Sequence, residues 1–189
     1  MYAHPADSKW PVLQPIVPGI QISILNYKVL QLTNDFYVER NICTELLPQV
    51  KEAGIKYGIN PVVLLAQIAI ETGWGESVLS KEHFNFGGLT GFGKPSEFWP
   101  GTKVQLCEKG LTYRSYPDAR SGILDMARLL RSSYASACNV SNVPAAYAQE
   151  IAYSRYISEV NGDNRDNYKQ LLVKLSATMS KLIALQFPE

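Results

Sequence analysis

The sequence predicts a mainly α-helical domain of the α+β class, with one small β hairpin. Apolar residues recur at helical spacing over residues 34–57 and again over 166–185, and an almost unbroken apolar run covers residues 61–72. Two short β-prone runs, 102–107 and 111–116, lie on either side of a Glu-Lys-Gly turn, which is the pattern of a hairpin. Helices therefore dominate, and the hairpin follows the apolar helix.

Length and composition limit the classes of function. The chain has 189 residues, enough for one core, and its net charge of +1 gives no basic field for nucleic acid. His4 and His83 lie far apart, and Cys43, Cys107 and Cys138 lack the paired spacing of zinc ligands. We therefore expect no metal, no cofactor and no nucleic-acid partner. Because the cysteine count is odd, three free thiols are expected, with one disulfide bridge as the alternative. The chain is also expected to be a monomer.

Residues 1–33 are predicted to form an extended N-terminal arm, because four prolines stand among isolated apolar residues. A short strand is expected at Ile20–Leu25. The start lacks a basic segment followed by an apolar run, so no secretory signal is expected. No stretch reaches the roughly 20 apolar residues of a membrane helix. The protein is therefore expected to be made in the cytoplasm.

The helices of residues 34–189 are expected to begin and end at recognisable signals. Pro48 should kink or split the first helix, and Gly58 should end it. Asn60 and Pro61 supply an N-cap and a first-turn proline for the next helix, which is apolar on all sides and hence central and buried. The segment 73–101 is expected to hold no helix. Three further helices are expected over residues 118–134, with Asp118 as N-cap, 142–156, started by Asn142 and Pro144, and 166–185.

Glu71 lies at the end of the apolar helix, immediately before Thr72-Gly73-Trp74-Gly75. A carboxyl group in such a partly desolvated place has a raised pKa. A glutamic acid kept protonated near neutral pH is what protonation of a glycosidic oxygen requires. The alternative is a structural salt bridge, but the helix dipole disfavours a carboxylate at this end. We therefore expect Glu71 to be the general acid of a glycosidase.

A glycosidase usually has a second carboxylate on the other side of the sugar. Glu108, at the tip of the predicted hairpin, is the first candidate, and a solvated turn residue is an equal alternative. Glu76, Glu97 and Asp118 are rivals. Glu76 is so close to Glu71 in sequence that it is better explained as ordering the loop, and Asp118 is better explained as an N-cap.

Aromatic residues are concentrated in the segment after Glu71. Sugar rings present apolar C–H faces, which aromatic side chains lining a groove suit. About half of these residues are expected to pack the core instead, and Trp74 and Phe86 are the expected substrate contacts. The first set is Trp74, Phe84, Phe86, Phe92, Phe98 and Trp99. A second set, whose hydroxyls suit an acetamido group, is Tyr113, Tyr116, Tyr134, Tyr153, Tyr156 and Tyr168.

Residues 46–75, which include Ala66-Gln-Ile-Ala-Ile-Glu-Thr-Gly-Trp-Gly75, resemble the opening of the glucosaminidase family of bacterial peptidoglycan hydrolases. This is the lysozyme-like group that contains flagellar rod-associated muramidases and many autolysins. Further segments resemble the family in the same order, beginning at Phe84, Tyr113, Leu129 and Tyr147. The resemblance covers roughly residues 35–180.

The resemblance implies a lysozyme-like helical domain with a small β-hairpin lobe over residues 34–189. It implies that Glu71 is the general acid, that Glu108 is the best match for the second carboxylate, and that Tyr134 and Tyr156 lie near the cleft. Tyr113 belongs to the matching strand. The implied reaction is hydrolysis of β-1,4 bonds in the glycan strands of peptidoglycan, with an N-acetylglucosaminidase favoured over a muramidase.

Two other functions stay open at this point. A lytic transglycosylase shares the architecture and needs one glutamate, and a non-catalytic cell-wall-binding or structural module would keep the fold for its groove. The expected place of action is the periplasm or cell wall. Delivery by a type VI secretion apparatus or by a phage would bring the protein there. A cognate immunity protein that plugs the cleft is the expected partner of an injected toxin.

Overall fold

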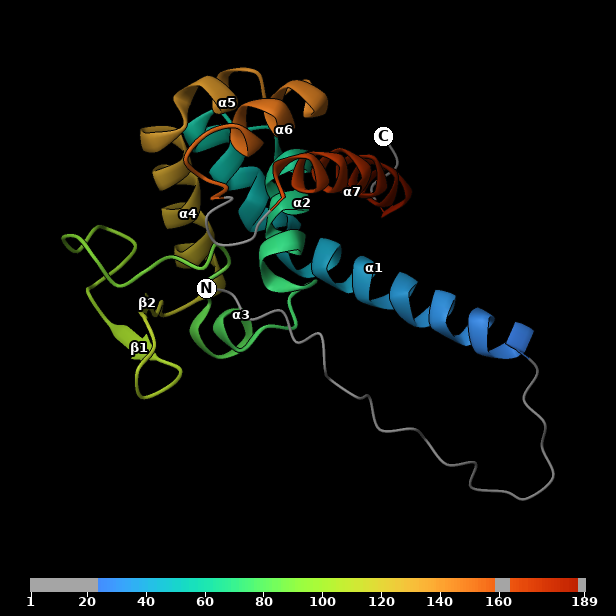
Figure 1. Cartoon of the computed structure of the whole chain (residues 1–189), viewed down its shortest axis with the longest axis horizontal. Coiled ribbons are helices and arrows are strands. Elements are labelled where there is room, and N and C mark those ends of the chain that lie inside the picture. Colours follow the sequence, from blue (N-terminus) through green and yellow to red (C-terminus); the bar gives the residue numbers. More distant parts are fainter. Residues whose placement is uncertain (1–23, 159–163, 187–189) are drawn as a thin grey trace. The chain divides into compact units, whose positions relative to one another are not determined.

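The computed structural model describes residues 24–158 and 164–186, with side chains over 41–158 and 164–185. The chain divides into two compact units, Met1–Tyr37 and Val38–Glu189. The order of elements, shown in Figure 1, is α1 (Ile24–Tyr57), α2 (Pro61–Thr72), α3 (Val78–His83), β1 (Lys103–Gln105), β2 (Thr112–Arg114), α4 (Ala119–Ser133), α5 (Ala135–Asn139), α6 (Pro144–Ala152) and α7 (Arg165–Gln186).

Helix α1 begins at Ile24, which corrects the prediction of an extended arm for residues 24–33. Residues 24–47 contain neither proline nor glycine. No helix breaker therefore separates residues 24–33 from the helix that was predicted to begin at residue 34. The strand expected at Ile20–Leu25 is wrong for its last two residues, and the rest of the predicted arm lies outside the described residues. Helix α1 also continues through Pro48 and is not split there.

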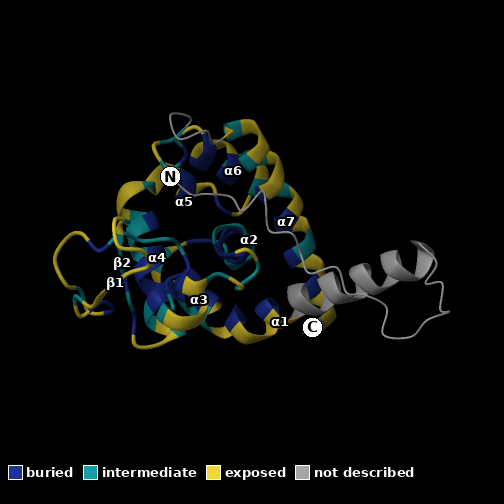
Figure 2. Ribbon diagram, turned by 60° about the horizontal axis from the view of Figure 1, so that its bottom comes forward, coloured by how far each residue is buried: buried dark blue, intermediate teal, exposed yellow. Residues whose placement is uncertain are grey.

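Helix α2 is the central helix of the second unit. Asn60 accepts the backbone N–H of Val62 at 2.8 Å, and Pro61 occupies the first turn, so both predicted start signals are confirmed. Every residue from Val63 to Ala69 is buried, and Figure 2 shows α2 as a mainly dark segment inside the helices. Helix α7 packs along it. Burial on all faces explains the unbroken apolar composition.

The core gathers around α2 from several helices. Helix α1 presents one face to it, and α4, α6 and α7 supply most of the rest. Helix α6 packs on both α5 and α7. The main residues from α1 are Ile42, Cys43, Leu46, Leu47, Val50 and Ala53, and those from the later helices are Ile123, Leu124, Met126, Ala127, Leu130, Tyr147, Ile151, Leu172 and Met179.

The predicted hairpin is present but shorter. Strands β1 and β2 pair antiparallel, with Val104 opposite Tyr113. Gln105 shortens the ladder, because its side-chain amide donates to the backbone oxygens of Glu108 and Gly110 and closes the connection as a loop. Thr90 adds an isolated bridge to Tyr113, which ties the preceding loop to the hairpin.

The remaining helix boundaries follow local capping, with some corrections. Asp118 caps α4 by accepting the N–H of Ser121 at 2.7 Å, as predicted. Helix α6 begins at Pro144, but Asn142 is not its cap and instead accepts from the side chain of Asn60. Helices α3 and α5 were not predicted, because six and five residues are too short to show a helical period.

None of the helices in the described ranges is long and apolar enough to cross a membrane.

Candidate active site

The carboxyl group of Glu71 lies among tyrosines that come from distant parts of the chain. Tyr156 Oη and Tyr168 Oη each donate a hydrogen bond of 3.0 Å to Oε1 of Glu71. The rings of Tyr134 and Tyr156 meet edge to face with centroids 5.5 Å apart, and those of Tyr156 and Tyr168 are 6.1 Å apart. We call Glu71, Tyr134, Tyr156 and Tyr168 the tyrosine site. All four residues are half-buried.

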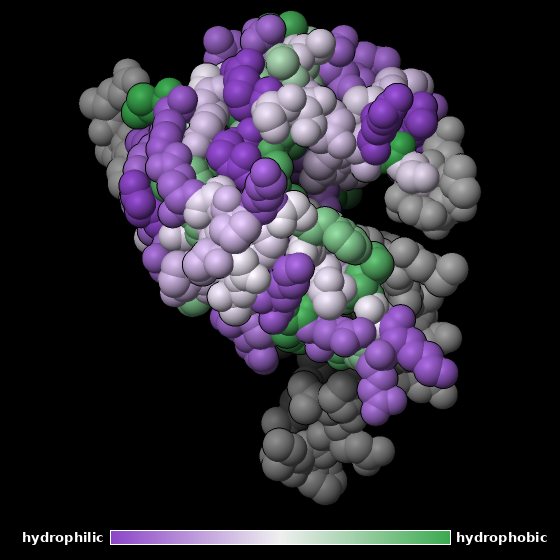
Figure 3. Space-filling model, turned by 90° about the vertical axis from the view of Figure 1, so that its left-hand side faces the viewer, coloured by the Kyte–Doolittle hydropathy of each residue, from purple (hydrophilic) through white to green (hydrophobic). Residues whose placement is uncertain are grey.

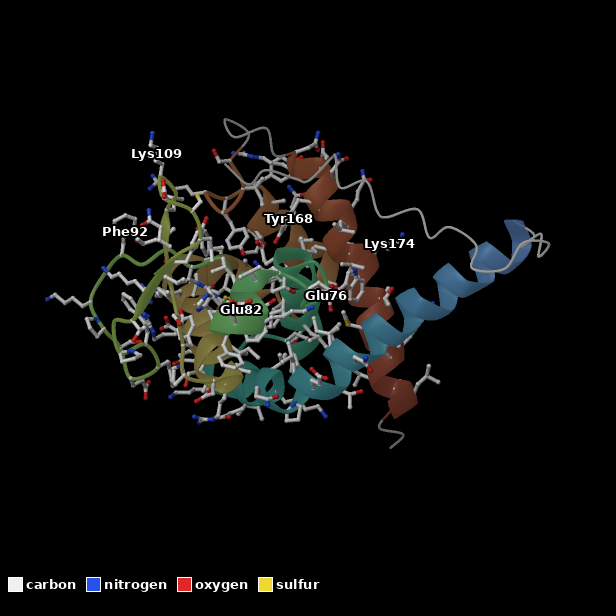
Figure 4. The ribbon with its side chains drawn as sticks, turned by 90° about the horizontal axis from the view of Figure 1, so that it is seen from below. Glu76, Glu82, Phe92, Lys109, Tyr168 and Lys174 are labelled. Atoms are coloured by element: carbon white, nitrogen blue, oxygen red, sulfur yellow. The ribbon has the colours of Figure 1, made fainter. Side chains whose placement is uncertain are left out.

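Each tyrosine is placed by the end of a helix. Tyr134 is the residue that ends α4, and Tyr156 lies in the turn that follows α6. Tyr168 lies in the first turn of α7, and Figure 4 labels it beside that helix. Because α7 packs along α2, its first turn reaches the end of α2 where Glu71 is located. The site therefore depends on helix packing rather than on a single motif.

The tyrosine hydroxyls of the site are held in the protonated state. The pKa of Tyr156 and of Tyr168 is raised well above 10, first because burial disfavours the tyrosinate and next because the charge of Glu71 opposes a second negative charge. Burial also raises the pKa of Tyr134. Tyr156 and Tyr168 are thus hydrogen-bond donors to Glu71 at any physiological pH, and a donor stabilises the charged form of a carboxylate.

The chain turns sharply directly after Glu71. Thr72 Oγ1 donates to the carbonyl oxygen of Ile68 at 2.6 Å and accepts from the N–H of Gly75 at 2.7 Å, which fastens the loop to α2. Gly73, Trp74 and Gly75 have φ of 56°, 64° and 84°. The left-handed region costs a residue with a side chain about 1–2 kcal/mol, and Trp74 is held in it by packing against the core.

Trp74 and Phe86, two predicted substrate contacts, line a hollow of about 390 Å³ between α1, the loop after Glu71 and α3. Glu71 is not among its lining residues. Trp74 is half-buried, whereas Phe86 is only 4% exposed and is part of the core, so its main role is packing. Phe98 and Trp99 are also buried, while Phe92 is 65% exposed. Three of the six aromatic residues in the first set are therefore buried, in agreement with the expectation that about half of them pack the core.

The predicted second carboxylate lies apart from the tyrosine site. Glu108 is exposed in the loop between β1 and β2, and within the described residues its side chain makes no hydrogen bond or ion pair. Figure 4 shows its neighbour Lys109 at the outer tip of the hairpin lobe, separated from Tyr168. Tyr113 is half-buried on β2 and is not part of the tyrosine site. Figure 3 shows the molecule from the side on which β1 and β2 lie, and this face is polar, with small separate hydrophobic areas.

The three rival carboxylates are engaged elsewhere. Glu76 forms an ion pair with Lys81, and Glu97 lies 3.2 Å from the ammonium of Lys56. The third, Asp118, is the N-cap of α4. Among the described residues no group of three or more His, Cys, Asp or Glu is placed to hold a metal ion. The three cysteines are free, with Cys43 and Cys138 buried and Cys107 exposed.

Two site residues were not singled out by the sequence. From the sequence, Tyr168 is only one tyrosine in a set, and Gln67 is only one residue of the motif that ends in Glu71. In the structure, the buried Tyr147 Oη donates to Gln67 Oε1 at 2.5 Å. A signal for Gln67 was available, because residues four apart share a helix face and Gln67 lies one turn before Glu71.

A helical domain with a short antiparallel hairpin, and with a glutamate at the end of its buried central helix, defines the lysozyme-like class of glycoside hydrolases. Residues 47–181 match the glucosaminidase family, described as mannosyl-glycoprotein endo-beta-N-acetylglucosaminidase. The chain belongs to this family. The predicted fold class, a lysozyme-like helical domain with a small β-hairpin lobe, is confirmed.

Three similar proteins illustrate the family and the fold. The peptidoglycan hydrolase FlgJ of Vibrio parahaemolyticus is 28% identical over 96 residues, which are 46% of this chain and 31% of FlgJ. The catalytic domain of the autolysin Auto from Listeria monocytogenes matches with a TM-score of 0.60 and 19% identity, over 89% of this chain and 99% of that one. A chain in the structure of a type VI secretion system effector–immunity complex from Pseudomonas protegens matches with a TM-score of 0.58 and 14% identity, over 78% and 94%.

Proposed function

We propose that the protein hydrolyses β-1,4 glycosidic bonds in the glycan strands of peptidoglycan, with Glu71 as the general acid. Membership of the glucosaminidase family supports this proposal, and so does the similarity to a FlgJ that is named as a peptidoglycan hydrolase. The single observation that carries the role of Glu71 is the pair of 3.0 Å hydrogen bonds that its Oε1 accepts.

These hydrogen bonds suit proton transfer to a sugar oxygen. A neutral carboxyl group whose Oε1 accepts two donors carries its proton on Oε2. When that proton passes to the leaving glycosidic oxygen, the C–O bond breaks and negative charge develops on the carboxyl group. The hydroxyls of Tyr156 and Tyr168 already point at this group and stabilise the charge as it forms. The two tyrosines thus contribute more to the transition state than to the ground state.

The group that assists at the anomeric carbon is proposed to be Glu108 or the acetamido group of the substrate. Glu108 is exposed on the hairpin loop, so the hairpin must carry it toward Glu71 before it can activate a water. The acetamido group needs no such movement, because it arrives with the sugar. Glu108→Gln separates these alternatives, since a carboxylate that activates water cannot be replaced by an amide without a large loss of kcat.

The proposed substrate contacts are Trp74, Tyr113, Tyr134 and Tyr156, whereas Phe86, which is 4% exposed, is proposed to support the wall of the hollow from the core. Trp74 carries the strongest case, because it is half-buried, follows Glu71 closely and lines a hollow. We propose that a sugar ring packs its apolar face on this indole. Cleavage after N-acetylglucosamine is favoured over cleavage after N-acetylmuramic acid, on the family description alone.

The decisive experiment is product analysis on purified peptidoglycan with the wild type, Glu71→Gln and Glu82→Gln. Glu82 is a matched control, because it is exposed on α3 and does not line the hollow. We expect the wild type and Glu82→Gln to release fragments with N-acetylglucosamine at a new reducing end, and Glu71→Gln to release almost none. Clearing of cell walls by Glu71→Gln at the wild-type rate would refute the proposal.

A lytic transglycosylase is the second candidate, and one observation favours it. Within the described residues the tyrosine site holds a single carboxyl group, and a transglycosylase needs one glutamate. Its product is an anhydro sugar that lacks the added water, which mass spectrometry of the fragments distinguishes. Binding of peptidoglycan without fragment release by any of the proteins would identify a non-catalytic binding module instead.

We also propose action in the periplasm or cell wall after delivery by a secretion apparatus or a phage, with a cognate immunity protein as partner. The similarity in fold to a chain of an effector–immunity complex supports delivery by a secretion apparatus and an immunity partner. Affinity purification from the native host tests it. We expect an inhibitor to co-purify at a fixed ratio, and an unaccompanied, fully active protein would count against a partner.

A further inference from the structure

Gln67 is fully buried on α2, and its carboxamide is oriented by a buried tyrosine. Tyr147 Oη donates to Gln67 Oε1 at 2.5 Å, and neither residue is exposed to solvent. With the oxygen so engaged, the Nε2 group is directed to the other side of the carboxamide. Within the described residues Nε2 has no hydrogen-bond partner. Folded proteins retain few such buried donors, so this one calls for an explanation.

The Gln67 side chain also interacts with a residue of the tyrosine site. The Gln67 side chain lies close enough to Tyr156 to act on its pKa as a hydrogen-bond partner, in the direction opposite to burial and to the charge of Glu71. Tyr156 in turn donates to Oε1 of Glu71. Gln67 also precedes Glu71 by one helical turn, so both side chains project from the same face of α2.

We propose that Gln67 is a positioning residue for the general acid, whose Nε2–H donates to the hydroxyl oxygen of Tyr156 and thereby directs the Tyr156 proton onto Oε1 of Glu71. The donors then run in one direction, from Tyr147 through Gln67 and Tyr156 to Glu71. Tyr168 reaches the same oxygen independently. The effect on catalysis rests on the proposed function of Glu71, whereas the order of the donors does not.

The opposite orientation of the carboxamide would break this order. With oxygen and nitrogen exchanged, Oε1 would face Tyr156 and compete with Glu71 for the one proton of that hydroxyl. The Tyr147 proton would also lose its acceptor in a buried place, where an unpaired polar group is destabilising. The bond from Tyr147 therefore sets which end of Gln67 faces the tyrosine site.

The test compares Gln67→Met, Tyr156→Phe and the double variant in the full chain, with kcat and KM measured on peptidoglycan fragments. Methionine keeps the length of the side chain and removes both hydrogen-bonding groups. We expect Gln67→Met to lower kcat about 10- to 100-fold with KM unchanged, the size of effect that a misplacement of ~1 Å produces. In the Tyr156→Phe background the same change should lower kcat less than about twofold, because the residue through which it acts is gone. Additive losses, or a change in KM alone, would overturn the inference.

Ser176→Ala is the matched control for a buried polar substitution. Ser176 is buried on α7 and donates to the Leu172 carbonyl oxygen of its own helix, outside the chain of donors. Its loss is expected to lower stability slightly and to leave kcat unchanged. If Gln67→Met does not fold, as judged by circular dichroism, Tyr147→Phe replaces it with the same expected pattern and a smaller loss.

A second readout does not depend on activity. NMR of protein labelled at the tyrosine ζ carbon reports the hydrogen bonding of each hydroxyl directly. We expect the Tyr156 resonance to shift in Gln67→Met and to stay in place in Ser176→Ala. An unchanged Tyr156 resonance in Gln67→Met would refute the order of donors. A wild type that cleaves no glycan would refute only the proposed function, so the two failures are distinguishable.

Discussion

Tyr168, in the first turn of α7, donates a 3.0 Å hydrogen bond to Oε1 of Glu71, at the end of α2, although 97 positions separate the two residues. The bond exists because α7 packs along α2. It links the proposed general acid to the last helix of the domain.

Tyr156→Phe and Tyr168→Phe are each expected to lower kcat while the protein stays folded. Each change removes one donor to Glu71, and a hydrogen bond to a charged group contributes about 1.5–3 kcal/mol, which corresponds to roughly 10- to 150-fold in rate. Tyr153→Phe is the matched control, since Tyr153 is exposed and donates to Asp166 outside the site. Steady-state kinetics on peptidoglycan fragments provides the measurement. Wild-type rates for both site variants would exclude a role for these hydroxyls.

Thr72→Val is expected to reduce both stability and activity. The change keeps the shape of the side chain but removes the hydroxyl that joins Ile68 to Gly75, for a cost of about 1–2 kcal/mol in the free energy of unfolding. Chemical denaturation measures the loss. Thr72→Ser should restore most of both properties, and Thr178→Val, at a half-buried position of α7, should change neither. A stable and fully active Thr72→Val would show that the loop after Glu71 needs no such bond.

Asp125 is expected to make the fold sensitive to acid. This fully buried residue accepts hydrogen bonds from Arg114 at 2.6 Å, from Arg128 at 2.7 Å and from Tyr116 at 2.9 Å. Burial acts to raise the pKa of Asp125, but the bonds from Arg128, Tyr116 and Arg114 outweigh it and lower that pKa. Since the folded pKa lies below the unfolded value of about 3.9, the stabilisation is complete above that pH and is lost as the pH falls through the folded pKa.

Asp125→Asn tests this expectation through the free energy of unfolding measured between pH 7 and pH 2. At pH 7 we expect a loss of about 3–5 kcal/mol, because two arginines lose a buried carboxylate. The variant should also lose less stability than the wild type below pH 4. Parallel pH curves for the two proteins would contradict the assignment.

Gly122→Ala is expected to destabilise the domain strongly. A Cβ atom at this position of α4 would lie 1.9 Å from the backbone oxygen of Phe84, and backbone cannot rotate away as a side chain can. Overpacking of this kind costs about 1–3 kcal/mol or more. Thermal unfolding measures the effect, and Ser133→Ala, at an exposed position of the same helix, is the control. Equal melting temperatures for the two variants would show that the contact relaxes freely.

Local signals in the sequence were enough for most helices of the domain. The start of α2 depends on Asn60 and Pro61, and its end on Gly73, all within one turn of the helix they limit. The cap of α4 at Asp118 is equally local. Where the local sequence signals were short or contradictory, the predicted secondary structure was wrong. Residues 24–33 follow a proline-rich segment yet are helical, and the six residues of α3 are too few to show a period.

The sequence by itself determined the buried helix α2, the sharp turn after it and the place of Glu71 between them. Helix caps, local backbone hydrogen bonds and glycine conformations act over a few residues, so their pattern can be recognised without a fold. Only the tertiary structure decided that Tyr156 and Tyr168, out of eleven tyrosines, donate to Glu71, that Tyr147 orients Gln67, and that Phe86 belongs to the core. The three hydrogen bonds join residues 80 or more positions apart, and the packing of whole helices, which no local pattern encodes, selects them.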